Sequence, residues 1–185
     1  MRKILLLSDA LFLLSGGLLG PIYALFVGKI GGDLLDASGA FAFFMLAAGA
    51  AVFLLAFWED KIKYPKVFII AGYGVSMIGT AGYLFVDSPR SLFIVQIVLG
   101  LAVALKDPAY DALFSLAGKR HLALAWGEWE AVDYLTLGLS AFAGGLIAQF
   151  LGFQILLWCM FLLSVFAFLS SILLLKTPKI SDGKI

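Results

Sequence analysis

Long apolar runs recur along the chain, and each of them is long enough to cross a membrane as a helix. A helix needs about 20 consecutive apolar residues to span the hydrocarbon core of a bilayer. Of the 185 residues, 63% are hydrophobic and 14% are charged, so a soluble fold of this size would lack the polar surface that water requires. We therefore predict an all-α integral membrane protein whose immediate partner is the lipid bilayer.

The spacing of the apolar runs predicts six transmembrane helices in one domain. The expected spans are about 4–27, 41–58, 67–86, 91–117, 122–151 and 154–175, followed by a short tail, 176–185. Proline lacks the backbone N–H that a helix needs, so we expect Pro21 to bend the first span. We expect Pro108 to kink the fourth span, which stays helical in pattern to about Ala117. The uncharged segment 150–154 suits a tight turn.

The charged residues 58–66 separate the second span from the third, and they set the predicted topology. This stretch holds five charges and a proline, so it must lie at a membrane surface where two helices turn around. If six spans alternate in direction, every lysine and arginine except Lys29 and Arg90 gathers on this side. Cytoplasmic segments are rich in these residues. We therefore expect an inner (plasma) membrane protein with both termini in the cytoplasm.

Three ionisable residues are expected at membrane depth: Asp9, Lys106 and Asp107. At about 1.5 Å per helical residue, Asp9 lies roughly 8 Å beyond Ile4, and Lys106 lies roughly 22 Å from the opposite surface. Charges at such depth are costly unless they are paired or hydrated, so we predict that they line a cavity that binds a substrate or a proton. For Asp9, the open alternative is a carboxylate that reaches the near interface, or one held by a lysine or by Ser8.

A second group of charged residues is expected near the cytoplasmic surface. Its members are Asp60, Lys61, Asp111, Glu130 and Asp133. Trp126 and Trp129 lie close by, as expected for the aromatic belt of a membrane protein. We predict a charge network that breaks and re-forms as a gate, and the alternative is a network with a purely structural role.

Several classes of function find no support in the sequence. The net charge of +1 gives no basic surface for nucleic acid. Cys159 is the one cysteine and His121 the one histidine, so we expect neither a disulfide nor a metal site. No nucleophile, phosphate-loop or zinc-protease motif is present, and we expect neither an enzyme nor a cofactor.

The loop between the second and third spans resembles a motif of the Major Facilitator Superfamily. That motif is roughly G-x-x-x-D-R/K-x-G-R/K-R/K, and Asp60-Lys61 with Lys63 and Lys66 is similar to it. Ala56 and Lys63 stand where the motif has glycine. The match is therefore partial.

Other parts of the chain resemble helices of the same family. Residues 18–27 are similar to the end of its first helix, and residues 100–110 to its fourth helix, where Gln96 replaces a usual arginine. Gly144-Gly145 resembles the end of the antiporter motif in the fifth helix, although its Gly-Pro positions hold Ser140 and Ala141.

The resemblance implies one six-helix half of a major-facilitator-type transporter. Such transporters combine two halves and bind substrate between them near the bilayer midplane. The implied function is that of a half-size permease that moves a small molecule by alternating access as a homodimer, so that Asp9 appears twice around a shared cavity. The alternative is a non-transporting membrane subunit or a regulator of another membrane protein.

Overall fold

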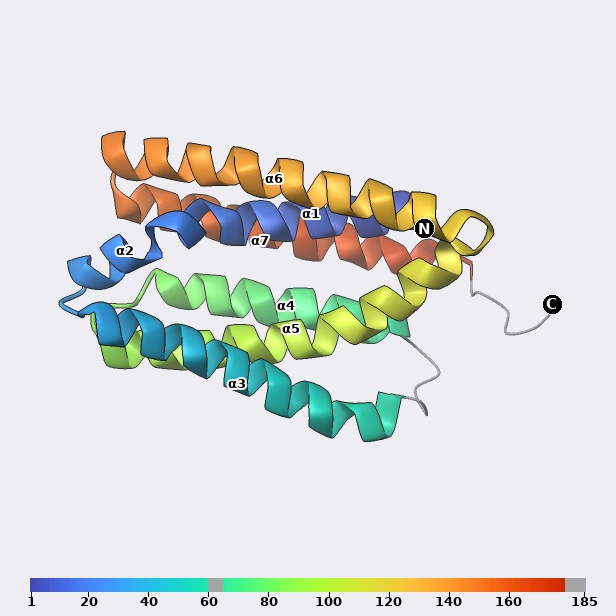
Figure 1. Cartoon of the computed structure of the whole chain (residues 1–185), viewed down its shortest axis with the longest axis horizontal. Coiled ribbons are helices and arrows are strands. Elements are labelled where there is room, and N and C mark those ends of the chain that lie inside the picture. Colours follow the sequence, from blue (N-terminus) through green and yellow to red (C-terminus); the bar gives the residue numbers. More distant parts are fainter. Residues whose placement is uncertain (60–64, 179–185) are drawn as a thin grey trace.

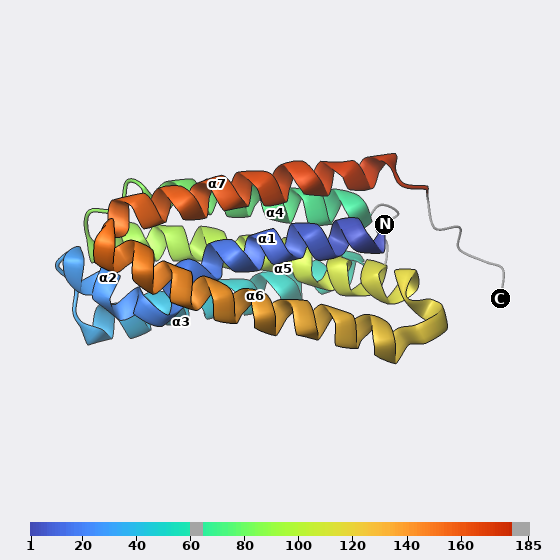
Figure 2. The same ribbon diagram turned by 90° about the horizontal axis from the view of Figure 1, so that it is seen from above.

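The protein is a bundle of long helices that run side by side (Figures 1 and 2). The computed structural model describes the backbone of residues 1–59 and 65–178, and every regular element in these ranges is a helix. The elements are α1 (Arg2–Leu19), η1 (Gly20–Ile22), α2 (Tyr23–Lys29), α3 (Leu34–Glu59), α4 (Pro65–Tyr83), α5 (Pro89–Ala117), η2 (Lys119–His121), α6 (Leu122–Phe150), α7 (Phe153–Ile172) and η3 (Leu173–Lys176). The expected all-α membrane fold of six helical spans is confirmed, with the first span made of α1, η1 and α2.

Capping residues fix where several helices begin. The Asp33 side chain accepts the N–H of Asp36, and the Asp36 side chain accepts the N–H of Asp33, so α3 begins at Leu34 rather than near the expected residue 41. This reciprocal arrangement satisfies backbone donors that a helix start leaves free. Gly152 turns the chain from α6 into α7 at a φ of 87°, which a glycine adopts at little cost.

The two prolines inside spans act differently. Pro21 lies in the 3₁₀ turn η1, which separates α1 from α2, so the first span is broken as expected. Pro108 lies inside α5, and that helix nevertheless continues from Pro89 to Ala117. The fourth span therefore stays helical to Ala117, as expected, and α5 changes direction toward α6 in its last turns (Figure 1).

The two ends of the bundle differ in their number of basic residues. The N-terminus, the start of α4, η2 and η3 lie at one end, which we call the basic end (Figure 1). Its described basic residues are Arg2, Lys3, Lys66, Lys119, Arg120 and Lys176. The opposite end carries Lys29 and Arg90 together with the acidic residues Asp33, Asp36 and Asp87. The alternation of the six spans between the two ends follows the predicted pattern.

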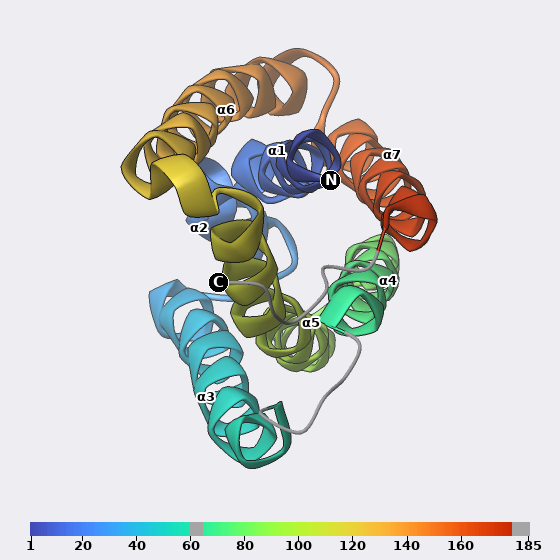
Figure 3. The same cartoon turned by 90° about the vertical axis from the view of Figure 1, so that its right-hand side faces the viewer.

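The helices pack in a pattern that repeats within the bundle. The first span, α1, packs on α6 and α7, while the fourth, α5, packs on α3 and α4 (Figure 3). Contacts between α4 and α7 join the two groups. If α1, α3 and α4 are exchanged with α5, α6 and α7 in that order, the same pairs of helices remain in contact. This is the pattern expected when two three-helix units of similar structure make up a six-helix bundle.

Glycines allow the closest helix approaches. A Cβ at Gly144 of α6 would collide with the Leu18 backbone of α1, and a Cβ at Gly100 of α5 would collide with the Phe44 carbonyl of α3. Small residues permit such contact where lipid gives no hydrophobic drive for helix association. By length and composition, five of the described spans are apolar enough to cross a membrane. The span outside that group is α4, which carries the small polar row Gly72, Ser76 and Thr80.

Candidate functional site

A buried ion pair joins the first span to the fourth. The Lys106 ammonium of α5 lies 2.7 Å from Asp9 Oδ1 of α1 and 2.9 Å from Asp107 Oδ1. The side chains of Asp9 and Lys106 are 3% and 7% exposed, whereas that of Asp107 is 45% exposed. Lys106 therefore bridges one carboxylate in the interior and one near the surface of the bundle.

Asp9 is held by three donors from three helices. Besides Lys106, the Tyr73 hydroxyl of α4 donates to Asp9 Oδ1 at 3.2 Å, and the Trp129 indole N–H of α6 donates to Oδ2 at 2.8 Å. A buried carboxylate is stable only when paired and hydrogen-bonded. Asp9 thus connects α1 with α4, α5 and α6 near the basic end.

Aromatic rings surround the Lys106 ammonium. Its Nζ lies 4.5 Å from the ring centre of Phe12, 5.2 Å from that of Tyr110 and 5.5 Å from that of Tyr73. Gly72 allows α4 to approach here, because a Cβ at this position would stand 2.7 Å from Lys106 Cβ. The close approach of α4 places Tyr73 against both charges.

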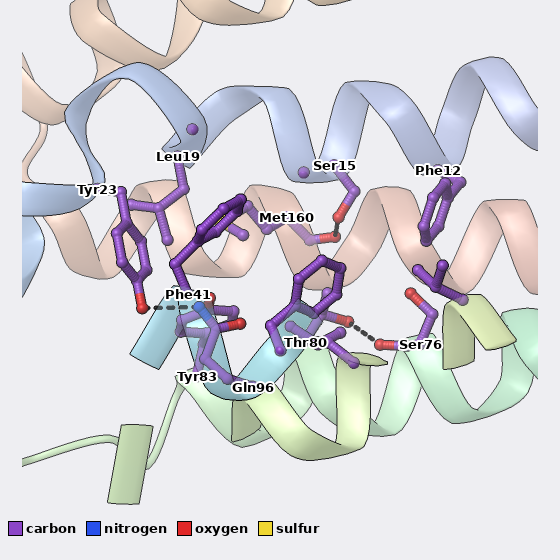
Figure 4. Close-up of a pocket in the computed structure, with 15 residues that line it drawn as sticks. Phe12, Ser15, Leu19, Tyr23, Phe41, Ser76, Thr80, Tyr83, Gln96 and Met160 are labelled. Atoms are coloured by element: carbon purple, nitrogen blue, oxygen red, sulfur yellow. Dashed lines mark hydrogen bonds between the residues drawn. The ribbon is translucent and has the colours of Figure 1, made fainter. Parts of the chain in front are cut away.

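A cavity of about 270 Å³ lies beside this cluster, between the first and fourth spans (Figure 4). Its walls come from α1, η1, α2, α3, α4, α5 and α7. The lining residues are Phe12, Ser15, Gly16, Leu19, Gly20, Tyr23, Phe41, Phe44, Ser76, Thr80, Tyr83, Gln96, Leu99, Val103 and Met160. All of them are uncharged, and most are aromatic, aliphatic or small.

Hydrogen bonds tie the polar groups of the cavity wall to one another. Gln96 Nε2 donates to the Tyr23 hydroxyl at 2.7 Å and links α5 to α2 at one end of the cavity (Figure 4). Thr80 Oγ1 lies 2.6 Å from Ser164 Oγ, which joins α4 to α7. Ser15 Oγ donates to the Met160 carbonyl at 2.8 Å. These bonds link α5 to α2, α4 to α7 and α1 to α7 around the cavity.

Phe12 connects the cavity to the charge cluster. It lines the cavity at the end away from Tyr23, and its ring also faces the Lys106 ammonium (Figure 4). The three predicted cavity residues are brought together by the fold, but Asp9, Lys106 and Asp107 do not line this cavity. Phe12 belongs both to the cavity wall and to the surroundings of the Lys106 ammonium.

Three members of the predicted gate, Asp111, Glu130 and Asp133, lie in the described part of the chain, toward the basic end. Glu130 and Asp111 are exposed and Asp133 is half-buried, and none of them is ion-paired within the described ranges. Asp60 and Lys61 lie outside the described residues. Glu128, which the sequence did not single out, pairs instead with Arg2 at 2.9 Å. The gate therefore stays a prediction.

Sequence reasoning missed several residues of this site. Trp129 was assigned to the interfacial belt, and Tyr73 and Phe12 were not singled out. Their roles follow from the rotation of each helix about its axis, which a run of apolar residues does not reveal. One available signal was Gln96, an amide at membrane depth, which needs a hydrogen-bond partner.

Comparison with known proteins agrees with this architecture. A family model described as Major Facilitator Superfamily matches residues 5–184. An uncharacterised transporter of this type from Methanocaldococcus jannaschii is 30% identical over 146 residues. The alignment covers 77% of this chain and 37% of the relative, so the chain spans well under half of that protein's length. This multi-pass membrane protein belongs to the Major Facilitator Superfamily.

Proposed function

We propose that this chain forms one six-helix unit of a permease that moves a small solute across the inner membrane by alternating access. The observation that carries the proposal is the cavity between α1 and α5, which lies beside a buried ion pair joining the same two helices. Members of the superfamily bind substrate where two six-helix units meet. Membership in the superfamily supports the same reading.

The ion pair is the proposed conformational switch. Asp9 and Lys106 hold α1 and α5 together near the basic end, and separating two charges in a low-dielectric interior is costly. When Asp9 takes up a proton or a cationic group, that cost falls because Lys106 keeps Asp107 as its partner. The two helices are then free to separate at this end, and the cavity opens toward it.

We place the basic end in the cytoplasm, because lysine and arginine concentrate in cytoplasmic segments. The proposed gate lies there. Its members are Asp60, Lys61, Asp111, Glu130 and Asp133.

A second six-helix unit is needed to complete the cavity, and we propose a second copy of this chain. Only 11% of the residues in the apolar stretches of α3 and of α6 are buried, against 44% in α5. These two helices flank α1 and α5 on one side of the bundle (Figure 3). Docking the second unit against α3 and α6 would enclose the cavity between the units.

Transport by reconstituted protein tests the proposal. A solute is first chosen from a panel of small molecules by thermal stabilisation of the purified protein, and its exchange is then measured in vesicles. Asp9→Asn should abolish the pH dependence of exchange, because the proposed proton-binding group is lost. Glu128→Gln removes a charge at an exposed pair and should leave the pH profile unchanged. An Asp9→Asn protein with unaltered exchange and pH profile would reject the switch.

Crosslinking tests the second unit. Gly49 of α3 and Gly138 of α6 can each carry a cysteine without a clash, because an added Cβ meets nothing within 4 Å at either position. If a second copy docks against α3 and α6, a Cys159→Ser chain with cysteines at both positions should crosslink to another copy of itself. A stable crosslink to a different protein, with no solute exchange by the purified chain, would favour the non-transporting subunit instead.

A further inference from the structure

We propose that the surroundings of Lys106 form a binding site for a small organic ammonium ion, and that Lys106 itself occupies this site in the present conformation. The ligand class is a primary or methylated alkylammonium, which resembles the end of a lysine side chain. The proposal rests on the proposed function only in treating the ligand as a transported solute. Binding itself does not depend on transport.

The walls of the site have the chemistry that recognises ammonium groups. Rings of Phe12, Tyr73 and Tyr110 stand within 4.5–5.5 Å of Lys106 Nζ. An ammonium is attracted to the face of an aromatic ring within about 6 Å of its centre, and cages of such rings bind quaternary and methylated ammonium ligands. Tyr110 is 2% exposed, and its hydroxyl has no hydrogen-bond partner among the described residues. This wall therefore keeps a polar group that a ligand can satisfy.

The charges of the site favour a cation over an anion. Lys106 contributes one positive charge, and its two direct partners, Asp9 and Asp107, contribute two negative charges. The cluster therefore has one uncompensated carboxylate when all three groups are ionised. A bound ammonium would neutralise that charge, whereas a bound anion would add to it.

Asp107 is an alternative ion-pair partner for Lys106. Lys106 touches both carboxylates at once, and the Asp107 side chain is 45% exposed while that of Asp9 is 3% exposed. When an ammonium ligand takes Asp9, Lys106 can remain paired with the more exposed Asp107. The exchange leaves neither carboxylate without a cation. Lys106 thus acts as a tethered competitor for its own site.

The cavity gives the ligand a route to the site. Its lining residues are uncharged, and Phe12 belongs both to the cavity wall and to the aromatic box. A cation in the cavity therefore meets the Phe12 ring next to Asp9. Rotation of the Phe12 side chain would let a ligand pass from the cavity to the surroundings of Lys106.

The test measures binding of n-butylammonium to the purified full chain by thermal stability, with 1-butanol and butyrate as neutral and anionic analogues. The wild-type protein should be stabilised by n-butylammonium alone. Lys106→Ala vacates the box and should lower the apparent Kd by about tenfold or more, because the competitor is removed. Lys106→Met fills the same space with an apolar chain and should show no such gain.

Two further variants separate ligand recognition from a structural role for Lys106. Asp107→Asn should weaken binding to the otherwise wild-type chain, because Lys106 loses its alternative partner, and should matter less in the Lys106→Ala background. Asp9→Asn should abolish binding in both backgrounds. If Lys106→Ala does not fold, n-butylammonium added during expression should recover folded protein. Recovery by 1-butanol as well, or by neither compound, would overturn the proposal.

Other outcomes are equally decisive. A wild-type protein that binds no alkylammonium would show that Lys106 is a fixed structural residue. Exchange of an uncharged solute without ammonium binding would overturn this inference and leave the proposed function standing. Ammonium binding without any exchange in vesicles would support the site and contradict transport by this chain.

Discussion

Replacing Lys106 with methionine should destabilise the protein more than replacing Asp9 with asparagine. After Lys106→Met, Asp9 stays buried with its Tyr73 and Trp129 donors but without a cation, and breaking a buried pair in this way costs about 3–5 kcal/mol. After Asp9→Asn, Lys106 keeps Asp107, so the expected cost is about 1–3 kcal/mol, typical of a lost charged hydrogen bond. The double variant leaves no buried charge unpaired, and the coupling energy should be about 1–3 kcal/mol.

The assay is reversible unfolding of each variant in mixed detergent micelles, followed by circular dichroism. Glu128→Gln, which breaks the exposed pair with Arg2, is the matched control and should change the unfolding free energy by less than about 1 kcal/mol. Additive losses in the double variant, or a larger loss for Asp9→Asn than for Lys106→Met, would refute the bridging role of Lys106.

Two other substitutions test the packing and the cavity. Gly144→Ala should destabilise the protein by about 1–3 kcal/mol, because its Cβ meets the α1 backbone, while Gly145→Ala, which meets nothing within 4 Å, should be neutral in the same unfolding assay. Tyr23→Phe removes the acceptor for Gln96 and should cost about 0.5–1.5 kcal/mol, and an unchanged unfolding free energy would show that this bond does not stabilise the fold.

The helices could be predicted from the sequence because bilayer thickness alone sets the length of an apolar run. The residues at which helices begin were harder to predict. The reciprocal bonds of Asp33 and Asp36 extend α3 well before the first strongly apolar residues. Pro108 was expected to kink the fourth span, and α5 continues through it and bends toward α6. A single proline removes one backbone bond, and tertiary packing can tolerate that loss.

The charged residues of the candidate site could be predicted from the sequence, but most of the residues that contact them could not. Charges at membrane depth must find counter-charges, so Asp9 and Lys106 stood out from their apolar neighbours. That Trp129 donates to Asp9, and that Phe12 contacts both the cavity and the Lys106 ammonium, depends on how each helix is rotated against the others. That rotation is set by close contacts such as the one at Gly72, whose partners on α5 are distant in sequence.

Accessibility of Gly16 tests the central claim most directly. Gly16 lines the cavity, and a Cβ there meets nothing within 4 Å, so Gly16→Cys in a Cys159→Ser chain should fold normally. A membrane-impermeant maleimide should label it from either side of sealed vesicles, and a bound solute should change the ratio of the two rates. Gly28→Cys, at the end opposite the basic end, should label from its own side alone. Labelling of Gly16→Cys from one side or from neither, under all conditions, would contradict alternating access.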